Sequence, residues 1–283
     1  MLLPILALAW GSATVSAHAI AGMRLFPSTL SFDDPGIGAE LPIVFEHDRA
    51  DGTERNVLSA AFTKPITSRF SLVAGGDYQR IGPDGMPTMK GWDNFSIGGA
   101  WQVYKIASSE SLAMVSLTDS VGGTGSRTIR SSYSTWTPEF AFGQGLGTVA
   151  TGWIRPLAVT GAVSVDLPTD STAPRMLDWA LSIQYSIPYL QDFVKDVGIR
   201  GPLANLIPIV EVPMQTCLDR GCGGHTTGSV NPGVIWIGRD YQWGVELEIP
   251  TSRASGESVG VLLGFDFYLD DLFPRVLGAP VFE

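Results

Sequence analysis

The residues just before the C-terminal tail alternate without a break between large apolar side chains and small or polar ones. In Val259–Leu269 the apolar positions are Val259, Val261, Leu263, Phe265, Phe267 and Leu269. A period of two places these side chains on one face of a β-strand. Strands of soluble proteins average about 5–6 residues, whereas a strand that crosses an outer membrane needs about 9–11. The length and aromatic content of this segment therefore favour a transmembrane strand.

The same alternation recurs along most of the chain and predicts about 12 strands, an even number as bacterial outer-membrane barrels require. The expected strands are Glu40–Asp48, Glu54–Lys64, Arg69–Gln79, Trp92–Tyr104, Ser111–Ser120, Tyr133–Gly145, Trp153–Asp166, Leu177–Ile187, Leu206–Pro213, Ser229–Ile237, Gln242–Ile249 and Val259–Leu269. The sequence therefore predicts an all-β fold, in which residues 40–269 form a closed antiparallel transmembrane β-barrel.

The apolar faces of these strands are expected to meet lipid. The residues expected on the lipid face include Phe95, Ile97, Trp101, Leu181, Ile183, Val261 and Phe265. Tryptophan and tyrosine lie mostly near strand ends, which is typical of the aromatic girdles at the two bilayer interfaces. The ordinary preference of aromatic residues for strands is the alternative explanation of this placement.

One segment breaks the alternation. Apolar residues recur there at helical spacing, namely Leu190, Phe193, Val194 and Val197. We therefore expect one short amphipathic helix over Tyr189–Val197. If both termini lie in the periplasm, this helix and the short turns share the periplasmic rim. Longer connections such as Val121–Ser131 and Met214–Thr227 then lie outside the cell, as outer-membrane barrels require.

The N-terminal residues resemble an export signal. Leu2–Trp10 is a short apolar core, and Ala17-His18-Ala19 is a cleavage site of the small-x-small type, although no Lys or Arg precedes the core. A first core strand or helix is the alternative. We expect residues 1–19 to form a signal peptide, cleaved near Ala19, that directs the chain to the outer membrane.

Two further segments lie outside the expected barrel. Residues 20–39 carry Pro27 and Pro35 in place of strand alternation. They are expected to form either a hatch folded into the lumen or a disordered periplasmic tail. Residues 270–283 are expected to form a C-terminal tail.

Composition narrows the classes of function. The net charge is -10, and no stripe of Lys and Arg is available to bind phosphates, so nucleic acid is not expected as a partner. Only 16% of the residues are charged, which is low for a surface that water must solvate on all sides. After the first residues, no apolar stretch is long enough for a transmembrane helix.

The two cysteines, Cys217 and Cys222, are expected to form a disulfide in a loop outside the cell. A zinc site would need two further ligands, and no metal or cofactor is expected. His47 and His225 remain once the signal peptide is removed, and no nucleophile motif surrounds either of them. We therefore expect no enzymatic activity and no catalytic residues.

The strand faces opposite the lipid face should line the lumen. Their acidic residues are Glu46, Asp77, Glu139, Asp178, Glu211, Glu246, Glu248 and Asp266. Small residues lie between them, including Gly75, Gly98, Ala100, Gly244, Gly260 and Gly264, and these should leave open space. An acidic lumen favours cations or neutral solutes over anions. The alternative is a packed polar core without a pore.

Several segments of strands and turns resemble a family of bacterial outer-membrane transporters of the phenol MetA-pathway type. They are Ser31–Gly36 (SFDDPG), Pro188–Gly198 (PYLQDFVKDVG), Leu206–Glu211 (LIPIVE), Thr227–Trp236 (TGSVNPGVIW) and Phe267–Pro274 (FYLDDLFP). The resemblance covers most of the mature chain and is strongest from Pro188 onward. It implies an outer-membrane β-barrel linked to the uptake of small, often aromatic compounds, and it carries over no substrate residues.

These observations together predict an outer-membrane channel for the passive uptake of small solutes, aromatic or hydrophobic ones among them. Its partners would be outer-membrane lipid and a small-molecule solute, while its oligomeric state stays open. One alternative is a closed structural or adhesion barrel that acts through its extracellular loops. Another is a membrane-embedded hydrolase.

Overall fold

The computed structural model describes residues 19–282. Nearly all of the predicted signal peptide, residues 1–18, lies outside this range. Within the described residues, no helix is both long and apolar enough to span a bilayer.

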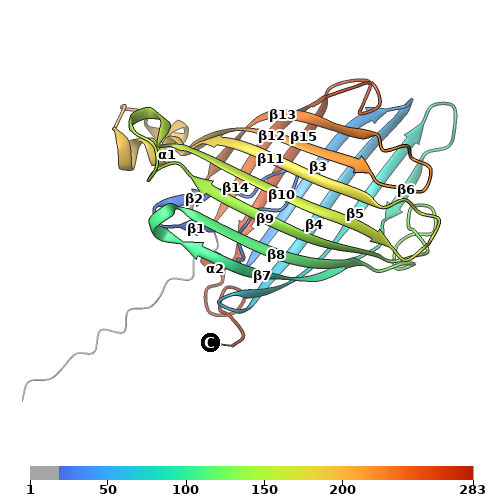
Figure 1. Ribbon diagram of the computed structural model, residues 1–283, viewed down its shortest axis with the longest axis horizontal. Helices are drawn as coiled ribbons and strands as arrows, with labels where there is room; N and C mark the ends of the chain where they lie inside the picture. The colour runs from blue at the N-terminus through green and yellow to red at the C-terminus, as the bar shows by residue number, and fades with distance from the viewer. Residues whose placement is uncertain (1–18, 283) are drawn as a thin grey trace, which may run out of the picture.

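Twelve strands of the described chain form one closed antiparallel barrel (Figure 1). In chain order they are β3 (Glu40–Ala50), β4 (Thr53–Thr67), β5 (Phe70–Pro83), β7 (Ser96–Ile106), β8 (Ser111–Ser120), β9 (Thr135–Gly145), β10 (Leu157–Pro168), β11 (Met176–Tyr185), β12 (Leu206–Cys217), β13 (Thr226–Ile237), β14 (Tyr241–Pro250) and β15 (Gly260–Tyr268). Pairing of β15 with β3 closes the sheet, so no barrel strand keeps an unpaired edge. The predicted fold class and strand number are confirmed.

For two strands the predicted start was four residues too early. The strand expected from Trp92 begins at Ser96, because Trp92 belongs to the short β6 (Met89–Trp92), which pairs with β5 instead. The strand expected from Trp153 begins at Leu157. The 3-10 helix η2 (Gly152–Ile154) precedes it, starting at Gly152 with a left-handed φ of 57°.

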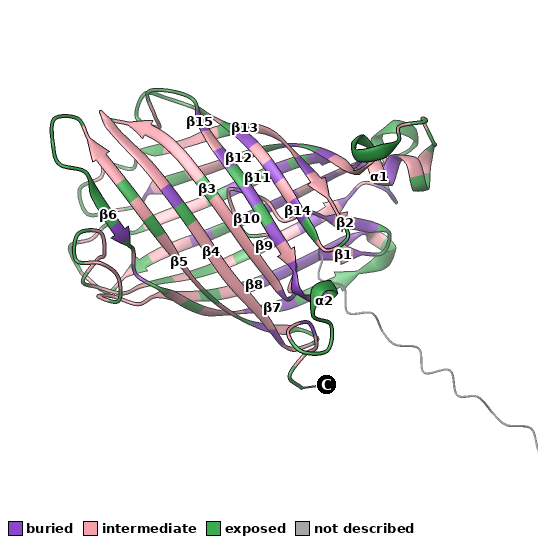
Figure 2. Cartoon of the chain, turned by 180° about the vertical axis from the view of Figure 1, so that it is seen from behind, coloured by how far each residue is buried: buried purple, intermediate pink, exposed green. Residues whose placement is uncertain are grey.

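Exposed and buried residues alternate along the barrel strands (Figure 2). The residues predicted to face lipid are exposed, including Ile97, Ile183 and Phe265 at 51–58%, while Val261 is half-buried. On β15, the buried residues Leu262, Gly264 and Asp266 alternate with these outward residues and point to the inward face. The outer surface is therefore apolar, while the inner surface carries small and polar side chains together with some buried apolar ones.

The two ends of the barrel differ. One end, here called the termini end, carries the N-terminal hairpin of β1 (Ala19–Ala21) and β2 (Arg24–Phe26) and the C-terminal α2 (Leu269–Leu272). It also carries most of the shorter connections, including η1 (Ala107–Ser109), together with the helical connection between β11 and β12 (Figure 1). The opposite end, the loop end, carries most of the longer connections.

The helical connection is present as predicted, but it begins at Ile187 and not at Tyr189, and it ends early. α1 (Ile187–Tyr189) continues into a π-helical turn, η3 (Leu190–Val194), and Lys195 is already extended. The helix was predicted to reach Val197. The last predicted residues form a turn instead, in which Gly198 adopts a left-handed φ of 79° and its N–H donates to Asp196 Oδ1 at 2.8 Å. A second short 3-10 helix, η4 (Gly201–Asn205), leads into β12.

Candidate functional site: the barrel lumen

The N-terminal segment, residues 19–39, contacts the inward faces of opposite barrel walls. Phe26 packs with Leu112 of β8 and Ala158 of β10. Leu30 packs with Ile209 of β12, Ile235 of β13 and Leu262 of β15. Phe32 and Ile37 then return to Ala100, Met114, Ala141 and Ala162 on β7 to β10. The segment therefore crosses the lumen and comes back before it enters β3.

Arg24 attaches the hairpin to the wall at the termini end. Its Nε lies 3.4 Å from Glu110 Oε2, and both side chains are 1% exposed. Its other nitrogens donate to the carbonyl oxygens of Pro156 at 2.8 Å and Arg155 at 2.5 Å. The guanidinium stacks on the ring of Tyr189, 3.8 Å from its centroid. These contacts join the hairpin to three separate connections of the barrel.

Glu110 is itself held by the surrounding backbone. It adopts a left-handed φ of 51°, which is uncommon for a residue with a side chain. The Tyr189 hydroxyl donates to Glu110 Oε1 at 2.7 Å, and the Gly147 N–H donates to Oε2 at 3.0 Å. A Cβ at Gly147 would overlap both the Tyr189 hydroxyl and the Glu110 carboxylate, so this position requires glycine. We call Arg24, Glu110, Gly147 and Tyr189 the latch.

On the opposite wall, polar groups hold the middle of the segment. Glu211 accepts hydrogen bonds from the N–H groups of Leu30 at 3.1 Å and Ser31 at 2.9 Å. The Ser28 hydroxyl donates to Asp266 Oδ2 at 2.5 Å, and the side-chain amide of Gln242 bonds both the N–H and the carbonyl of Ser28. The Ser31 hydroxyl lies 3.5 Å from Glu246 Oε2.

Three of the eight acidic residues predicted to line the lumen therefore contact this segment. Glu211, Glu246 and Asp266 are 0–2% exposed. They point inward, as the alternation indicates, but they meet protein rather than open space.

Two of the small residues expected to leave open space are filled. A Cβ at Gly244 would lie 2.8 Å from Leu30 Cδ1, and a Cβ at Gly264 would lie 3.0 Å from Leu30 Cγ. These glycines therefore form a hollow that receives Leu30. The interpretation of Gly244 and Gly264 as free lumen was wrong, because a segment distant in the sequence occupies the space.

A cavity of about 610 Å³ lies between the N-terminal segment and the loop end. Four predicted acidic residues line it, namely Glu46, Glu139, Asp178 and Glu248. It extends to the connection between β14 and β15 at the loop end, where Ala254–Gly256 line it. Within residues 19–282, Glu139 Oε1 and Glu248 Oε2 have no hydrogen-bond partner.

Arginine side chains offset some of the charge in this cavity. Arg55 pairs with Glu46 and, at 2.9 Å, with Asp48. Arg49 pairs with Asp84 at 2.6 Å and Glu257 at 3.6 Å. Glu139, Asp178 and Glu248 are not among the partners of either arginine in these ion pairs, so acidic side chains outnumber basic ones in the cavity wall.

A second cavity, of about 490 Å³, adjoins the first and shares Ser31, Phe32, Glu46, Pro213 and Glu248 with it. It lies between the N-terminal segment and strands β3 to β8, and the predicted residue Asp77 lines it. Asp33, Asp34 and Glu40 also line it, and no Lys or Arg of the described chain does.

The sequence reasoning missed the latch and the acidic residues of the second cavity that come from the N-terminal segment. One signal was present: Arg24 is the only Lys or Arg between residues 20 and 48. Its partner Glu110 could not have been identified, because 86 residues separate the two and Glu110 follows a short turn with no distinguishing pattern.

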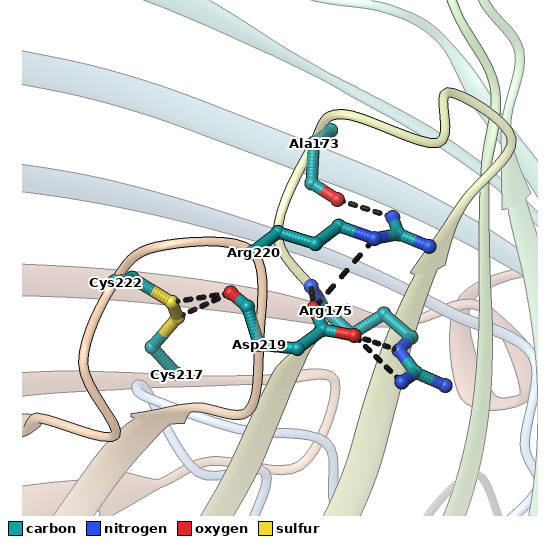
Figure 3. Close-up of a disulfide and its surroundings, with 6 residues drawn as sticks. All are labelled: Ala173, Arg175, Cys217, Asp219, Arg220 and Cys222. Carbon is teal, nitrogen blue, oxygen red and sulfur yellow. Dashed lines mark hydrogen bonds and ion pairs between the residues drawn. A yellow bond between two sulfur atoms is a disulfide. The ribbon is translucent and has the colours of Figure 1, made fainter.

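The predicted disulfide between Cys217 and Cys222 is confirmed, with a Cα–Cα distance of 5.9 Å. It closes the β12–β13 connection at the loop end (Figure 3). Asp219, inside this ring, accepts from the Arg175 N–H at 2.9 Å and from Arg175 Nε at 2.6 Å. These hydrogen bonds hold the pKa of Asp219 below its usual range. Arg220 donates to the carbonyl oxygens of Asp170 and Ala173, so the ring is tied to the neighbouring connection.

The described residues contain no group of three or more His, Cys, Asp or Glu side chains placed to hold a metal ion. His47 Nδ1 lies 3.0 Å from Asn56 Oδ1, and this partner is neither a nucleophile nor a carboxylate.

No family model and no curated protein matches this sequence. The resemblance to transporters of the phenol MetA-pathway type is therefore not confirmed. Among solved structures, the chain is similar to the COG4313 outer membrane channel from Pseudomonas putida F1, with a TM-score of 0.52 and 12% identity over 86% of this chain and 99% of that one. It is also similar to the NanC porin, with a TM-score of 0.50 and 8% identity over 80% of this chain and 98% of that one.

LpxR from Salmonella typhimurium matches less well, with a TM-score of 0.46 and 9% identity over 81% of this chain and 99% of that one, and it carries no argument. Identities this low establish the fold alone, which is that of outer-membrane β-barrels. The absence of enzymatic activity stays a prediction.

Proposed function

We propose that this chain is an outer-membrane channel that takes up small solutes passively. The observation that carries the proposal is the pair of adjoining cavities inside a closed barrel with an apolar outer face. A structural barrel with a packed core would need neither cavity. The names of two similar structures, an outer membrane channel and a porin, support the same function.

In this proposal residues 1–19 are a signal peptide and both termini lie in the periplasm. The shorter connections at the termini end and the disulfide at the loop end favour this orientation. Solute would enter the cavity at the loop end from outside the cell.

The charge of the cavities favours cations or neutral solutes. Glu139, Asp178 and Glu248 line the first cavity, and the second has no basic residue in its lining. Fixed carboxylates that line a narrow path raise the local concentration of cations and repel anions. Phe32, Pro213 and Met214 add apolar surface to the first cavity, which suits solutes with an aromatic or hydrophobic part.

The N-terminal segment is proposed to act as a hatch that narrows the path. Its contacts cross the lumen from β8–β10 to β12–β15, and the latch closes the termini end beside η1. A solute that passes from the second cavity to the periplasm must therefore pass this segment or displace it.

Single-channel conductance in planar bilayers tests the proposal. We expect small conductance steps from the full chain, cation preference in a salt gradient, and larger steps once residues 20–38 are deleted. Heat-modifiable migration on gels checks that the deletion variant still forms a barrel. Equal steps in the two proteins would show that the path does not run past this segment.

One observation favours a second candidate, a closed barrel that acts through its loops. The N-terminal segment fills much of the lumen. Its Arg24 and the partner of this arginine, Glu110, are both buried. This candidate predicts no conductance from the full chain, and conductance from the full chain would exclude it.

A further inference from the structure

The termini end of the barrel carries an exposed apolar surface that the proposed channel does not use. Its residues, here called the rim patch, are Val149, Trp153, Ile154, Phe193 and Leu203. They are 40–73% exposed although they lie in connections and not on the lipid-facing strands. Val149, Trp153 and Ile154 belong to the β9–β10 connection, and Phe193 and Leu203 belong to the β11–β12 connection.

The two connections form one surface. η2, which contains Trp153 and Ile154, contacts η3, which contains Phe193. Lys195 Nζ lies 5.9 Å from the centre of the Trp153 ring and links the connections further. A soluble rim would not need five large apolar side chains facing water, and a contiguous apolar patch marks a binding surface.

Leu203 and the rest of η4 lie on the outer side of the barrel wall and not over the lumen. Ile235 of β13 is 0% exposed and faces inward, so the next residue, Trp236, faces outward. The Trp236 indole N–H donates to the carbonyl oxygen of Pro202 in η4 at 2.9 Å. Leu203 is the next residue along the chain. η4 therefore lies against the outer face of β13 and adjoins the lipid-facing surface. Both views place the helical connection at the edge of the barrel wall (Figures 1 and 2).

The patch is also continuous with that lipid-facing surface along the chain. Ile183 on β11 is 57% exposed on the outer face, and α1 begins four residues later. Segments that combine exposed Trp, Phe and Leu with Lys or Arg are typical of the layer between lipid headgroups and acyl chains. Lys195 on Trp153 is one such pairing, because a lysine can reach the headgroups while the ring stays in the apolar layer.

We propose that the rim patch inserts into the interfacial layer of the bilayer leaflet at the termini end, so that the β11–β12 connection anchors the barrel rim to lipid. The anchor reaches the lumen through two ring contacts. The Phe193 ring lies 5.0 Å from the Tyr189 ring, and Tyr189 stacks on Arg24. Lipid contact would therefore restrain the residue that holds the N-terminal hairpin. The inference rests on the barrel crossing a membrane and not on its conducting solutes.

A fluorescent label at Leu203 tests the proposal in the full-length protein. Both native cysteines are in the disulfide, so Leu203→Cys supplies the single free thiol for an environment-sensitive dye. The protein is reconstituted in phosphatidylethanolamine–phosphatidylglycerol vesicles that contain lipid with a doxyl quencher high on the acyl chain. Ile183→Cys is the lipid-facing control. Met86→Cys is the water-facing control, since Met86 is 64% exposed in the loop-end connection.

We expect the label at position 203 to emit at shorter wavelength than the label at position 86. Shallow doxyl lipid should quench it and aqueous iodide should not. A label on Ile154→Cys should behave in the same way. This second variant provides the test if Leu203→Cys does not fold. Iodide quenching equal to that at position 86 would overturn the proposal. Emission could instead shift with the protein-to-lipid ratio and not be quenched by the doxyl lipid. The patch would then bind a second copy of the chain, and this result would also overturn the proposal.

Discussion

The two halves of the lumen are built from the same strands but do different things. In the half at the termini end, inward polar groups meet partners from the N-terminal segment, as Glu110 meets Arg24 and Glu211 meets two backbone N–H groups. In the half at the loop end, Glu139, Asp178 and Glu248 line a cavity. The strands alone therefore do not decide whether a carboxylate is structural or available to solute. A segment that belongs to no barrel strand decides it.

Among substitutions in the two halves, one at the latch should have the largest effect on how firmly the N-terminal segment is held. Replacing Arg24 by Met leaves Glu110 buried without its cation, and removing one partner of a buried ion pair costs about 3–5 kcal/mol. The loss should release the hairpin. The rate at which chymotrypsin cuts after Phe32 should therefore rise by the corresponding factor.

The matched control for Arg24→Met is Arg49→Met at the loop end, whose ion pairs are partly exposed. Such pairs contribute about 0–1 kcal/mol, and cutting of the N-terminal segment should not change. Equal cutting of the Arg24 variant and the native protein would show that the latch does not hold the hairpin.

Leu30→Ala should have the next largest effect. The side chain fills the hollow formed by Gly244 and Gly264, and truncation of a buried Leu costs about 2–5 kcal/mol. Chymotrypsin should again cut the segment faster. Leu181→Ala removes a lipid-facing side chain of the same type and should leave this rate unchanged. If chymotrypsin cuts both variants at the same rate, the packing of Leu30 against Gly244 and Gly264 does not hold the segment.

Gly147→Ala tests the latch by adding a methyl group to it, whereas the substitutions above remove side-chain atoms. The added methyl overlaps the Tyr189 hydroxyl and the Glu110 carboxylate, and overpacking of this kind costs about 1–3 kcal/mol. Gly82→Ala is the loop-end control, since its nearest atom would be Thr88 Oγ1 at 3.6 Å. Protease sensitivity of the N-terminal segment should rise in the first variant alone, and an equal rise in both would remove the argument for tight packing at Gly147.

The smallest effect on stability, and the sharpest on permeation, is expected from Glu248→Gln. Glu248 lines both cavities, so its replacement should move the reversal potential in a salt gradient towards a non-selective channel. Its effect on unfolding should be small, because Glu248 Oε2 has no hydrogen-bond partner to lose. Glu246→Gln should leave the reversal potential unchanged, because Glu246 is buried beside Ser31. Equal shifts from both variants would mean that the path reaches Glu246, and the two halves would then not be distinct.

Much of the barrel could be predicted from the sequence because each strand repeats a local rule. A strand between lipid and lumen must alternate, and β8 has the same bounds, Ser111–Ser120, in the prediction and in the structure. Strand ends were less predictable. Trp153 fits the alternation of β10, yet a left-handed Gly152 places it in a 3-10 helix beyond the strand. Such turns depend on single backbone angles that hydrophobic periodicity does not report.

The strands, their outward faces and the disulfide could be predicted from the sequence, because each depends on near neighbours along the chain. The environment of each inward carboxylate, by contrast, depends on contacts between distant parts of the chain. Glu246 and Glu248 are two residues apart on one face of β14, yet the first lies against Ser31 and the second lines both cavities. The contact of Glu246 with Ser31 joins residues 215 apart in the sequence. Alternation fixes the direction of a side chain, but only the path of the N-terminal segment through the lumen fixes what that side chain meets.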